Sequence, residues 1–375
     1  MPFCVFAQND TSSTSIEKQH RPWSFGIFYD QDHSLELLGI CLNEDRNYTM
    51  GFGMYYQSEA LKKNILYVPL KMLNKTLGYH EKFKTGPSLR QAPTYALLFG
   101  GSGFTPDSLA TSKVIYNDRP YASIMVLQTI INNTREEAKN GRTLYRNYRS
   151  GFTFGWLGAS IQGKIQTAIH VAANKNDTRA PRTPRGWNNQ VSNGGEPTLM
   201  YSYSKEMLLT KKHIQGQNPS KSVGLEFKHA YKYNLGYYTS LAYEFAFRAG
   251  KFDARNWIYN ASPTGSINKN VTDKSAHNKK LCEIYLTGSA RPVFMLYNAL
   301  LNGQFRKSLH TVNFNDTRHL ILEFEAGPGI TAPVGKHHAV DFRLLFSGRS
   351  PEFKLPGRDT RFHYWAGAYL IYSFY

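Results

Sequence analysis

Residues 237–247 read YYTSLAYEFAF, in which apolar and polar side chains alternate at nearly every position. Leu241, Tyr243 and Phe245 share one face, and Ser240 and Glu244 lie on the other. Because successive side chains of a strand point to opposite faces, this period of two predicts a β-strand with one apolar and one polar face. A carboxylate is costly in a dry core but natural beside water. The segment therefore predicts either the wall of a wide hydrated barrel or an open sheet with a wet face.

The same alternation runs along the chain in both directions from this segment. It is clear in residues 24–32, 95–104, 143–157, 222–231, 320–326, 340–346 and 363–375. Segments of about ten residues are long enough for a tilted strand that crosses a membrane. Closing such strands into a barrel removes exposed edges. The pattern predicts an all-β fold, an antiparallel transmembrane β-barrel of about twelve strands that forms one domain over residues 23–375.

Composition narrows the class of protein without deciding it. The 375 residues carry a net charge of +18, with 25 tyrosines, 23 phenylalanines and a mean hydropathy of −0.46. This balance suits a membrane barrel, and a soluble sandwich with an aromatic core gives similar totals. Cys4, Cys41 and Cys282 are too few for a disulfide framework, and no CxxC spacing indicates zinc. The sequence contains no run of eighteen apolar residues, so it predicts no membrane-spanning helix.

The basic charge and the first residues each favour an interpretation. Lysines and arginines are spread over the predicted loops, which favours a polyanionic partner such as lipid head groups or nucleic acid. Since no nucleic-acid-binding motif accompanies them, we expect no nucleic acid partner. Residues 2–7 (PFCVFA) resemble the end of a signal peptide. Residues 1–22 are therefore interpreted as the remnant of a signal peptide or a short leader, the alternative being a chance apolar terminus.

One stretch, residues 158–190, has the period of a helix. Two adjacent stripes recur every four residues, one apolar and one polar: Ile161, Ile165 and Ile169, and Gln162, Gln166 and His170. Pro181 and Pro184 follow and end the pattern. The stretch predicts a short loop helix that presents a histidine, either as part of a site or simply to water.

Five landmarks in order resemble the outer-membrane lipid A 3'-O-deacylase family. They are the acidic end of the first strand (residues 30–32), DRNYTMG (45–51), NDRPYA (117–122), the Gln/His helix followed by RGWNNQ (185–190), and RSPEF (349–353). The resemblance extends from about residue 24 to residue 375. It implies a twelve-stranded barrel in the bacterial outer membrane, with its site near the outer leaflet between the wall and a short extracellular-loop helix.

The resemblance also implies an activity and its residues. The family removes the 3'-linked acyloxyacyl chain of lipid A in lipopolysaccharide and depends on calcium. The general base falls on His170 and the threonine of the YT-x-G motif on Thr49. The metal-binding Asn-Asp pair falls on Gln31 and Asp32, and the glutamine is one methylene longer than asparagine. Asp30, on the same predicted face as Asp32, is the alternative ligand.

Further roles are predicted around this site. Gln166, one turn before His170, is predicted to orient the imidazole ring or the water molecule. Lys113 and Arg185 are predicted to bind the phosphates of lipid A, because arginine suits bidentate contacts with phosphate. The segment 118–121 is interpreted as a turn that starts a strand, and Glu352 as an ion-pair partner within the lumen. We expect a monomer.

Three rival functions remain open from the sequence. The barrel could have lost activity and serve as a lipid-binding or structural protein, and the change at Gln31 favours this. A passive porin predicts an open channel, whereas an enzyme of this family predicts a filled lumen. A soluble carbohydrate-binding sandwich would need no membrane.

Overall fold

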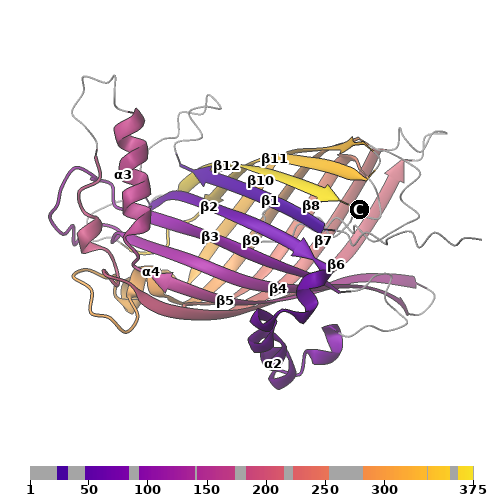
Figure 1. The fold of residues 1–375 in the computed structure, drawn as a ribbon, viewed down its shortest axis with the longest axis horizontal. Coiled ribbons are helices and arrows are strands. Elements are labelled where there is room, and N and C mark those ends of the chain that lie inside the picture. The colour runs from indigo at the N-terminus through magenta and orange to yellow at the C-terminus, as the bar shows by residue number, and fades with distance from the viewer. Residues whose placement is uncertain are drawn as a thin grey trace, which may run out of the picture.

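The computed structural model describes residues 23–32, 47–83, 93–139, 142–173, 183–214, 223–252, 282–335, 337–354 and 362–374. Within these ranges the chain forms a closed antiparallel barrel of twelve strands (Figure 1). The strands are β1 (Trp23–Gln31), β2 (Asn47–Ser58), β3 (Thr94–Thr105), β4 (Ala122–Lys139), β5 (Arg142–Leu157), β6 (Glu196–Ile214), β7 (Val223–Gly236), β8 (Tyr238–Lys251), β9 (Glu283–Asn298), β10 (Leu320–Val334), β11 (His338–Arg349) and β12 (His363–Phe374). The predicted fold class is confirmed.

Each strand pairs with its neighbours in sequence, and β1 closes the barrel against β12. The closing ladder runs from Trp23 opposite Phe374 to Gln31 opposite Ala366. Two ends of the barrel are therefore distinct. Helix α3 (Ile161–Ala173) lies at the end where β1 finishes, and helix α2 (Val68–Thr76) lies at the end where β1 starts (Figure 1). We call these the α3 end and the α2 end.

The two faces of the wall have the character that the alternation predicts. Large apolar side chains such as Phe99, Leu241 and Phe245 are exposed on the outside. Their neighbours in sequence, such as Leu98 and Glu244, line a cavity of about 310 Å³ inside the barrel. An apolar exterior around a charged interior is the arrangement of a barrel in a membrane rather than of a soluble sandwich.

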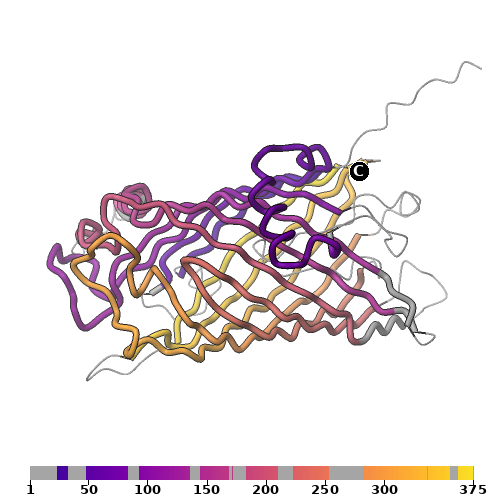
Figure 2. Tube along the Cα trace, turned by 90° about the horizontal axis from the view of Figure 1, so that it is seen from below, coloured from indigo at the N-terminus to yellow at the C-terminus, as the bar shows by residue number. Residues whose placement is uncertain are grey.

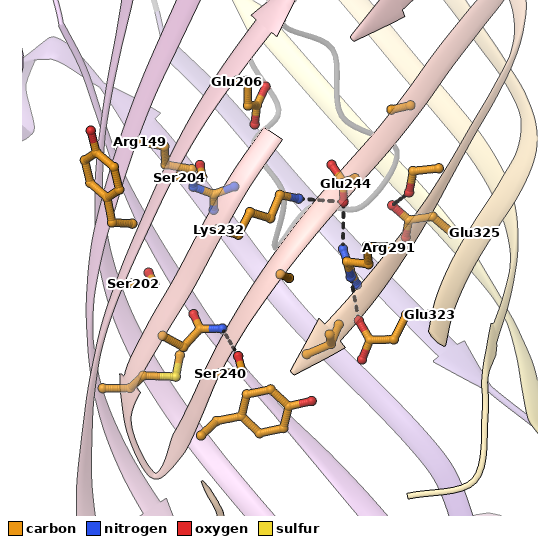
Figure 3. A pocket seen from close by; sticks show the side chains of 18 of the residues that line it. Arg149, Ser202, Ser204, Glu206, Lys232, Ser240, Glu244, Arg291, Glu323 and Glu325 are labelled. Atoms are coloured by element: carbon orange, nitrogen blue, oxygen red, sulfur yellow. Dashed lines mark hydrogen bonds and ion pairs between the residues drawn. The ribbon is translucent and has the colours of Figure 1, made fainter. Parts of the chain in front are cut away.

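Ion pairs cross the interior of the barrel from strand to strand. Glu244 binds both Lys232, at 2.6 Å, and Arg291, at 3.0 Å (Figure 3). Arg291 also binds Glu323, which in turn binds Arg349 at 2.6 Å. Each of these charges is partnered, which offsets the cost of removing it from bulk water.

An apolar cluster lies inside the barrel at the α3 end. The short helix α4 (Ala299–Asn302) buries Ala299 and Leu300 against Phe104 and Ile124 of the wall. Phe104 and Ile124 alternate with outward-facing residues and so point into the barrel. This apolar cluster occupies part of the lumen, which favours the filled lumen expected of the enzyme over the open channel expected of a porin.

The sequence of residues 61–91 predicts a strand-like piece and a long lysine-rich loop, and this prediction is wrong where the structure describes the segment. In place of a strand-like piece and a loop, the chain forms the 3-10 helices η1 (Glu59–Lys63), η2 (Ile65–Tyr67) and η3 (His80–Phe83), with α2 between the last two. Side chains cap the first two turns: Ser58 accepts from the amide of Ala60, and Asn64 from that of Leu66. Helices therefore begin at residues that compete well for free amides.

A bulge changes the predicted faces of β2. The register shifts between Tyr48 and Met50. The alternation predicts that Tyr48 shares the outer face with Met54 and Tyr56, but its hydroxyl donates to the Asp30 carboxylate and its ring packs against Trp365. The extra residue of a bulge re-aims the side chains beyond it. Period-two reasoning fails at such a position because the backbone itself leaves the period.

Candidate functional site on the outer wall

The hairpin ends of β1 and β2 bring Asp32 and Thr49 together. The backbone amide of Asp32 donates to the carbonyl of Thr49 at 3.4 Å, which continues the ladder one residue beyond β1. The Thr49 and Thr105 hydroxyls share a hydrogen bond of 2.7 Å, which ties the pair to β3. Asp32 is 4% exposed and Thr49 is 5% exposed. Two of the predicted site residues are thus buried neighbours at the α3 end.

The other two predicted metal ligands face apart. Both carboxylate oxygens of Asp30 accept hydrogen bonds from tyrosines, one from Tyr48 and one from Tyr369 at 3.3 Å. Gln31 lies on the opposite face of β1, where its amide oxygen accepts from the hydroxyl of Tyr29. These contacts favour a structural role for Asp30. They leave Gln31 beside Met50, its partner across the ladder.

Helix α3 packs on the outside of the wall. Gly101 and Gly103 share the outer face of β3 with the exposed Phe99. A methyl group added to Gly101 would lie 2.3 Å from Nε2 of Gln162 and 2.5 Å from the sulfur of Met125. Gln162 is fully buried and its Nε2 donates to that sulfur at 3.6 Å. The glycines therefore let the start of α3 approach the wall, on the strand that also carries Thr105.

A tryptophan fixes the next polar residue of the helix. The indole N–H of Trp187 donates to Oε1 of Gln166 at 2.7 Å, and both side chains are buried. Trp187 also packs on Tyr121 and closely against Gly163. Because the tryptophan can only donate, the oxygen of the Gln166 amide must face it. Among the described residues the Nε2 of Gln166 has no hydrogen-bond partner, so its N–H groups remain available to a bound molecule or water.

The position of His170 is set by the helix alone. Its backbone belongs to the last turn of α3, and its side chain lies outside the described residues. Gln166 and Gln162 lie on the same helical stripe, one turn and two turns earlier. The structure therefore confirms the predicted helix, whereas the role of His170 stays a prediction.

The predicted phosphate-binding residues lie on two loops that cover this end. Lys113 and Arg185 are both exposed. The backbone amide of Arg185 donates to the carbonyl of Leu109 at 2.9 Å. The side-chain amide of Asn189 donates to the backbone carbonyl of Ser112 at 2.8 Å. The two loops are thus held together, although no described contact joins either basic side chain to the Asp32–Thr49 pair.

Two further landmarks meet inside the barrel rather than at this outer site. Arg119 and Glu352 form a buried ion pair, and Arg349 binds the same carboxylate at 3.1 Å. Burial disfavours the charged form of Glu352, but the two guanidinium groups outweigh it and lower its pKa to about 2. The prediction that Glu352 is an ion-pair partner is confirmed. Arg119 also stacks on Phe104, so the NDRPYA motif fastens the loop to the wall.

Sequence reasoning missed the glycines that make room for α3. The motif FGGSGF, residues 99–104, carries Gly101 and Gly103 at alternate positions of one face. A glycine in a strand often marks a place where another element approaches closely, and this was the available signal. The cavity in Figure 3 is a different place, because its lining residues face the lumen.

The described donors suit calcium only in part. Calcium takes six to eight oxygen ligands, as a rule from carboxylates, carbonyls and water. Asp32 offers such oxygens at the end of β1, whereas the amide oxygen of Gln31 accepts from Tyr29 on the other face of that strand. Within the described ranges no group of three or more His, Cys, Asp or Glu side chains is placed to hold a metal ion. The chemistry of the donors fits, and the described part of the chain supplies an incomplete set.

The closed wall, the apolar exterior and the charged interior define a β-barrel of the outer-membrane type. The family model described as outer membrane protein LpxR matches residues 2–372, and the chain belongs to this family. It is an outer-membrane protein, from a family of barrels that modify lipid A. No helix within the described ranges is long and apolar enough to cross a membrane.

The fold agrees with that of a solved structure. The structure of LpxR from Salmonella typhimurium is 16% identical, covers 94% of this chain and 100% of its own, and superposes with a TM-score of 0.62. The β domain of the Bordetella autotransporter BrkA is 10% identical over 94% of this chain and 98% of its own, with a TM-score of only 0.42. No curated protein matches the sequence. At 16% identity the Salmonella structure shows the shared fold.

Proposed function

We propose that the protein is a calcium-dependent hydrolase that removes the 3'-linked acyloxyacyl chain from lipid A. One observation carries the proposal: the helix of His170 packs on the outer face of β3, the strand that is hydrogen-bonded to Thr49 beside Asp32. A site on the outer wall meets a lipid substrate laterally, so the lipid need not leave the membrane.

The ester bond is cleaved by an activated water molecule in this proposal. A neutral imidazole of His170 accepts a proton from water as the oxygen attacks the ester carbonyl. The tetrahedral intermediate collapses, the acyloxyacyl group leaves as a carboxylic acid, and the proton passes to the departing 3' oxygen. Gln166, held by Trp187, turns its N–H groups toward the bound water or the reacting oxygen.

The developing negative charge needs compensation close to the carbonyl. Asp32 and Gln31 would hold calcium, with carbonyl oxygens and water completing its shell. When bound, the ion supplies positive charge for the oxyanion. Thr49 hydrogen-bonds Thr105 and positions the start of β2 next to Asp32. Lys113 and Arg185 are assigned to the phosphates of lipid A, and this places the α3 end at the outer leaflet.

A second candidate is a barrel that binds lipid without cleaving it. The observation that favours it is Gln31, whose oxygen is engaged by Tyr29 at a position where the family has asparagine. If calcium binding is lost there, the wall and the loops would still bind an acylated lipid.

Mass spectrometry of lipid A after incubation with the purified barrel separates these candidates. Reactions contain calcium or EDTA, with His170→Ala as the test and His337→Ala, an exposed residue at the opposite end, as its control. We expect loss of the 3' acyloxyacyl mass only with calcium and an intact His170. A folded barrel that never cleaves the lipid, yet binds it, would favour the second candidate.

A further inference from the structure

The chain between β2 and β3 is attached to the outside of the wall at the α2 end (Figures 1 and 2). We call Glu59–Phe83 the α2 segment. The hydroxyl of Tyr67 donates to the carbonyl of Ala96 at 2.5 Å. The side chain of Asn74 donates to Ser150 at 2.9 Å and accepts from Tyr201 at 2.8 Å. Contacts to β3, β5 and β6 therefore fix this segment against the barrel.

The opposite face of the α2 segment exposes aliphatic side chains. Ile65 is 79% exposed and Met72 is 64% exposed, and Leu66 and Val68 are exposed beside them. Each large apolar side chain left in water forgoes the favourable free energy of burial. Because the segment is fixed to the barrel, it cannot turn to bury these aliphatic side chains against the wall. The face therefore calls for an apolar surrounding outside the protein.

Lysines surround this apolar face. Lys62, Lys63 and Lys75 are exposed, and the ammonium group of Lys71, a residue of α2, lies over the ring of Tyr95. Residues 59–83 contain five lysines and two glutamates, a formal charge of +3. Aliphatic side chains flanked by lysine on a short helix are typical of segments that lie in a lipid head-group layer and attract anionic lipids.

The height of the segment on the barrel agrees with that location. Trp23 packs on Tyr56 and Tyr372 at the α2 end, an aromatic cluster of the kind found at the membrane surface. Tyr56 pairs with Leu97 of β3, and Tyr95, two residues away, packs edge-on against Tyr67 of the α2 segment. The segment thus lies at the level of the aromatic cluster.

We propose that the α2 segment docks into the head-group layer of anionic phospholipid at the α2 end of the barrel. The aliphatic face enters the acyl boundary and the lysines bind lipid phosphates. The segment rests on the strand β3 and its neighbours, and α3 packs on the outer face of β3 at the other end. Docking at one end therefore sets how deeply the opposite end of this same wall sits in the membrane. The proposal does not depend on any hydrolytic activity.

The test measures the surroundings of one residue in the intact barrel. Cys4, Cys41 and Cys282 are replaced by serine, and Met72→Cys carries an environment-sensitive fluorophore in nanodiscs of phosphatidylglycerol and phosphatidylcholine. Leu241→Cys, on the apolar belt, and Tyr116→Cys, 71% exposed on a loop at the α3 end, are the references. We expect head-group spin labels to quench residue 72 and aqueous iodide to quench it severalfold less than residue 116. Iodide quenching equal to that at residue 116 would overturn the proposal.

A second variant tests the choice of lipid. In Lys62→Gln/Lys63→Gln/Lys75→Gln, which keeps the aliphatic face, we expect the shielding of residue 72 to fall to the level seen in phosphatidylcholine alone. Shielding that is the same with and without phosphatidylglycerol contradicts the anionic lipid. Shielding found only in native membranes, and absent from both nanodiscs, would indicate a protein partner instead.

Discussion

Trp187 and Gln166, 21 residues apart in the sequence, are joined by a buried hydrogen bond of 2.7 Å from the indole N–H to the amide oxygen. The bond determines which way the amide points. The ring of Trp187 also lies next to Gly103 of β3 and against Gly163 of α3, so this side chain connects its own segment to both the helix and the barrel wall.

Trp187→Phe removes this hydrogen bond and retains most of the ring. An intramolecular hydrogen bond contributes about 0.5–1.5 kcal/mol, so we expect kcat on lipid A to fall roughly 3- to 10-fold as the Gln166 amide loses its orientation. KM should change little because the loops remain in place. Steady-state kinetics with Trp23→Phe, at the other end, as the control would measure this. Equal effects of both substitutions would contradict a positioning role.

Gly101→Ala tests whether α3 must approach the wall. The added methyl would meet Gln162 and Met125 at 2.3 and 2.5 Å, and overpacking of this kind costs about 1–3 kcal/mol. We expect hydrolysis to fall at least about tenfold. The matched control is Gly103→Ala, whose methyl would make an ordinary contact of 3.4 Å with Trp187. Heat-modified mobility in gels should show that both variants still form the barrel.

The pair at the end of β1 is tested by changing one ligand at a time. Asp32→Asn removes a negative charge from the proposed calcium site, and we expect the calcium concentration for half-maximal hydrolysis to rise at least tenfold. Gln31→Asn restores the amide length of the family and should lower that concentration. Calcium titrations of the two variants and the parent barrel measure both effects. An unchanged titration for Asp32→Asn would exclude it as a ligand.

The ion pairs of Glu352 should stabilise the α3 end of the barrel in a way that is lost in acid. Its pKa is held at about 2, below the ordinary 4.5, so its stabilising effect is complete above pH 4.5 and is lost as pH falls toward 2. Removal of one partner of a buried ion pair costs about 3–5 kcal/mol, so Glu352→Gln should unfold at a clearly lower temperature at neutral pH. Its melting temperature should also fall less between pH 4.5 and 2. The exposed Glu59→Gln serves as the control.

The sequence predicted the strands well because a wall between lipid and a wet lumen imposes a strict period of two. The segment 237–247 has this period, and β8 forms there. Tyr48 escaped the prediction because a bulge breaks the period without an obvious residue signal. The α2 segment escaped because its apolar residues, packed on one side and exposed on the other, have no regular pattern.

Only those contacts of the site that join consecutive strands could be predicted from the sequence. Thr49 and Asp32 are neighbours because adjacent strands pair, which the order of motifs implies. The contact between Gln162 and Gly101 joins elements that are not consecutive, and only three-dimensional packing reveals it. The ion pair of Arg119 with Glu352 likewise joins two distant loops, so the motifs gave its members but not their pairing.

The closing ladder between Trp23 and Phe374 has a consequence for biogenesis. The barrel has no sealed edge until its last strand meets its first, so nearly the whole chain must be synthesised before the final pairing forms. Contacts between residues so distant in sequence are slow to form because the loop between them loses much entropy. Until then, the open edges of β1 and β12 would pair readily with other chains. We therefore expect assembly of this protein to need a chaperone that covers the edges of β1 and β12 until the barrel closes.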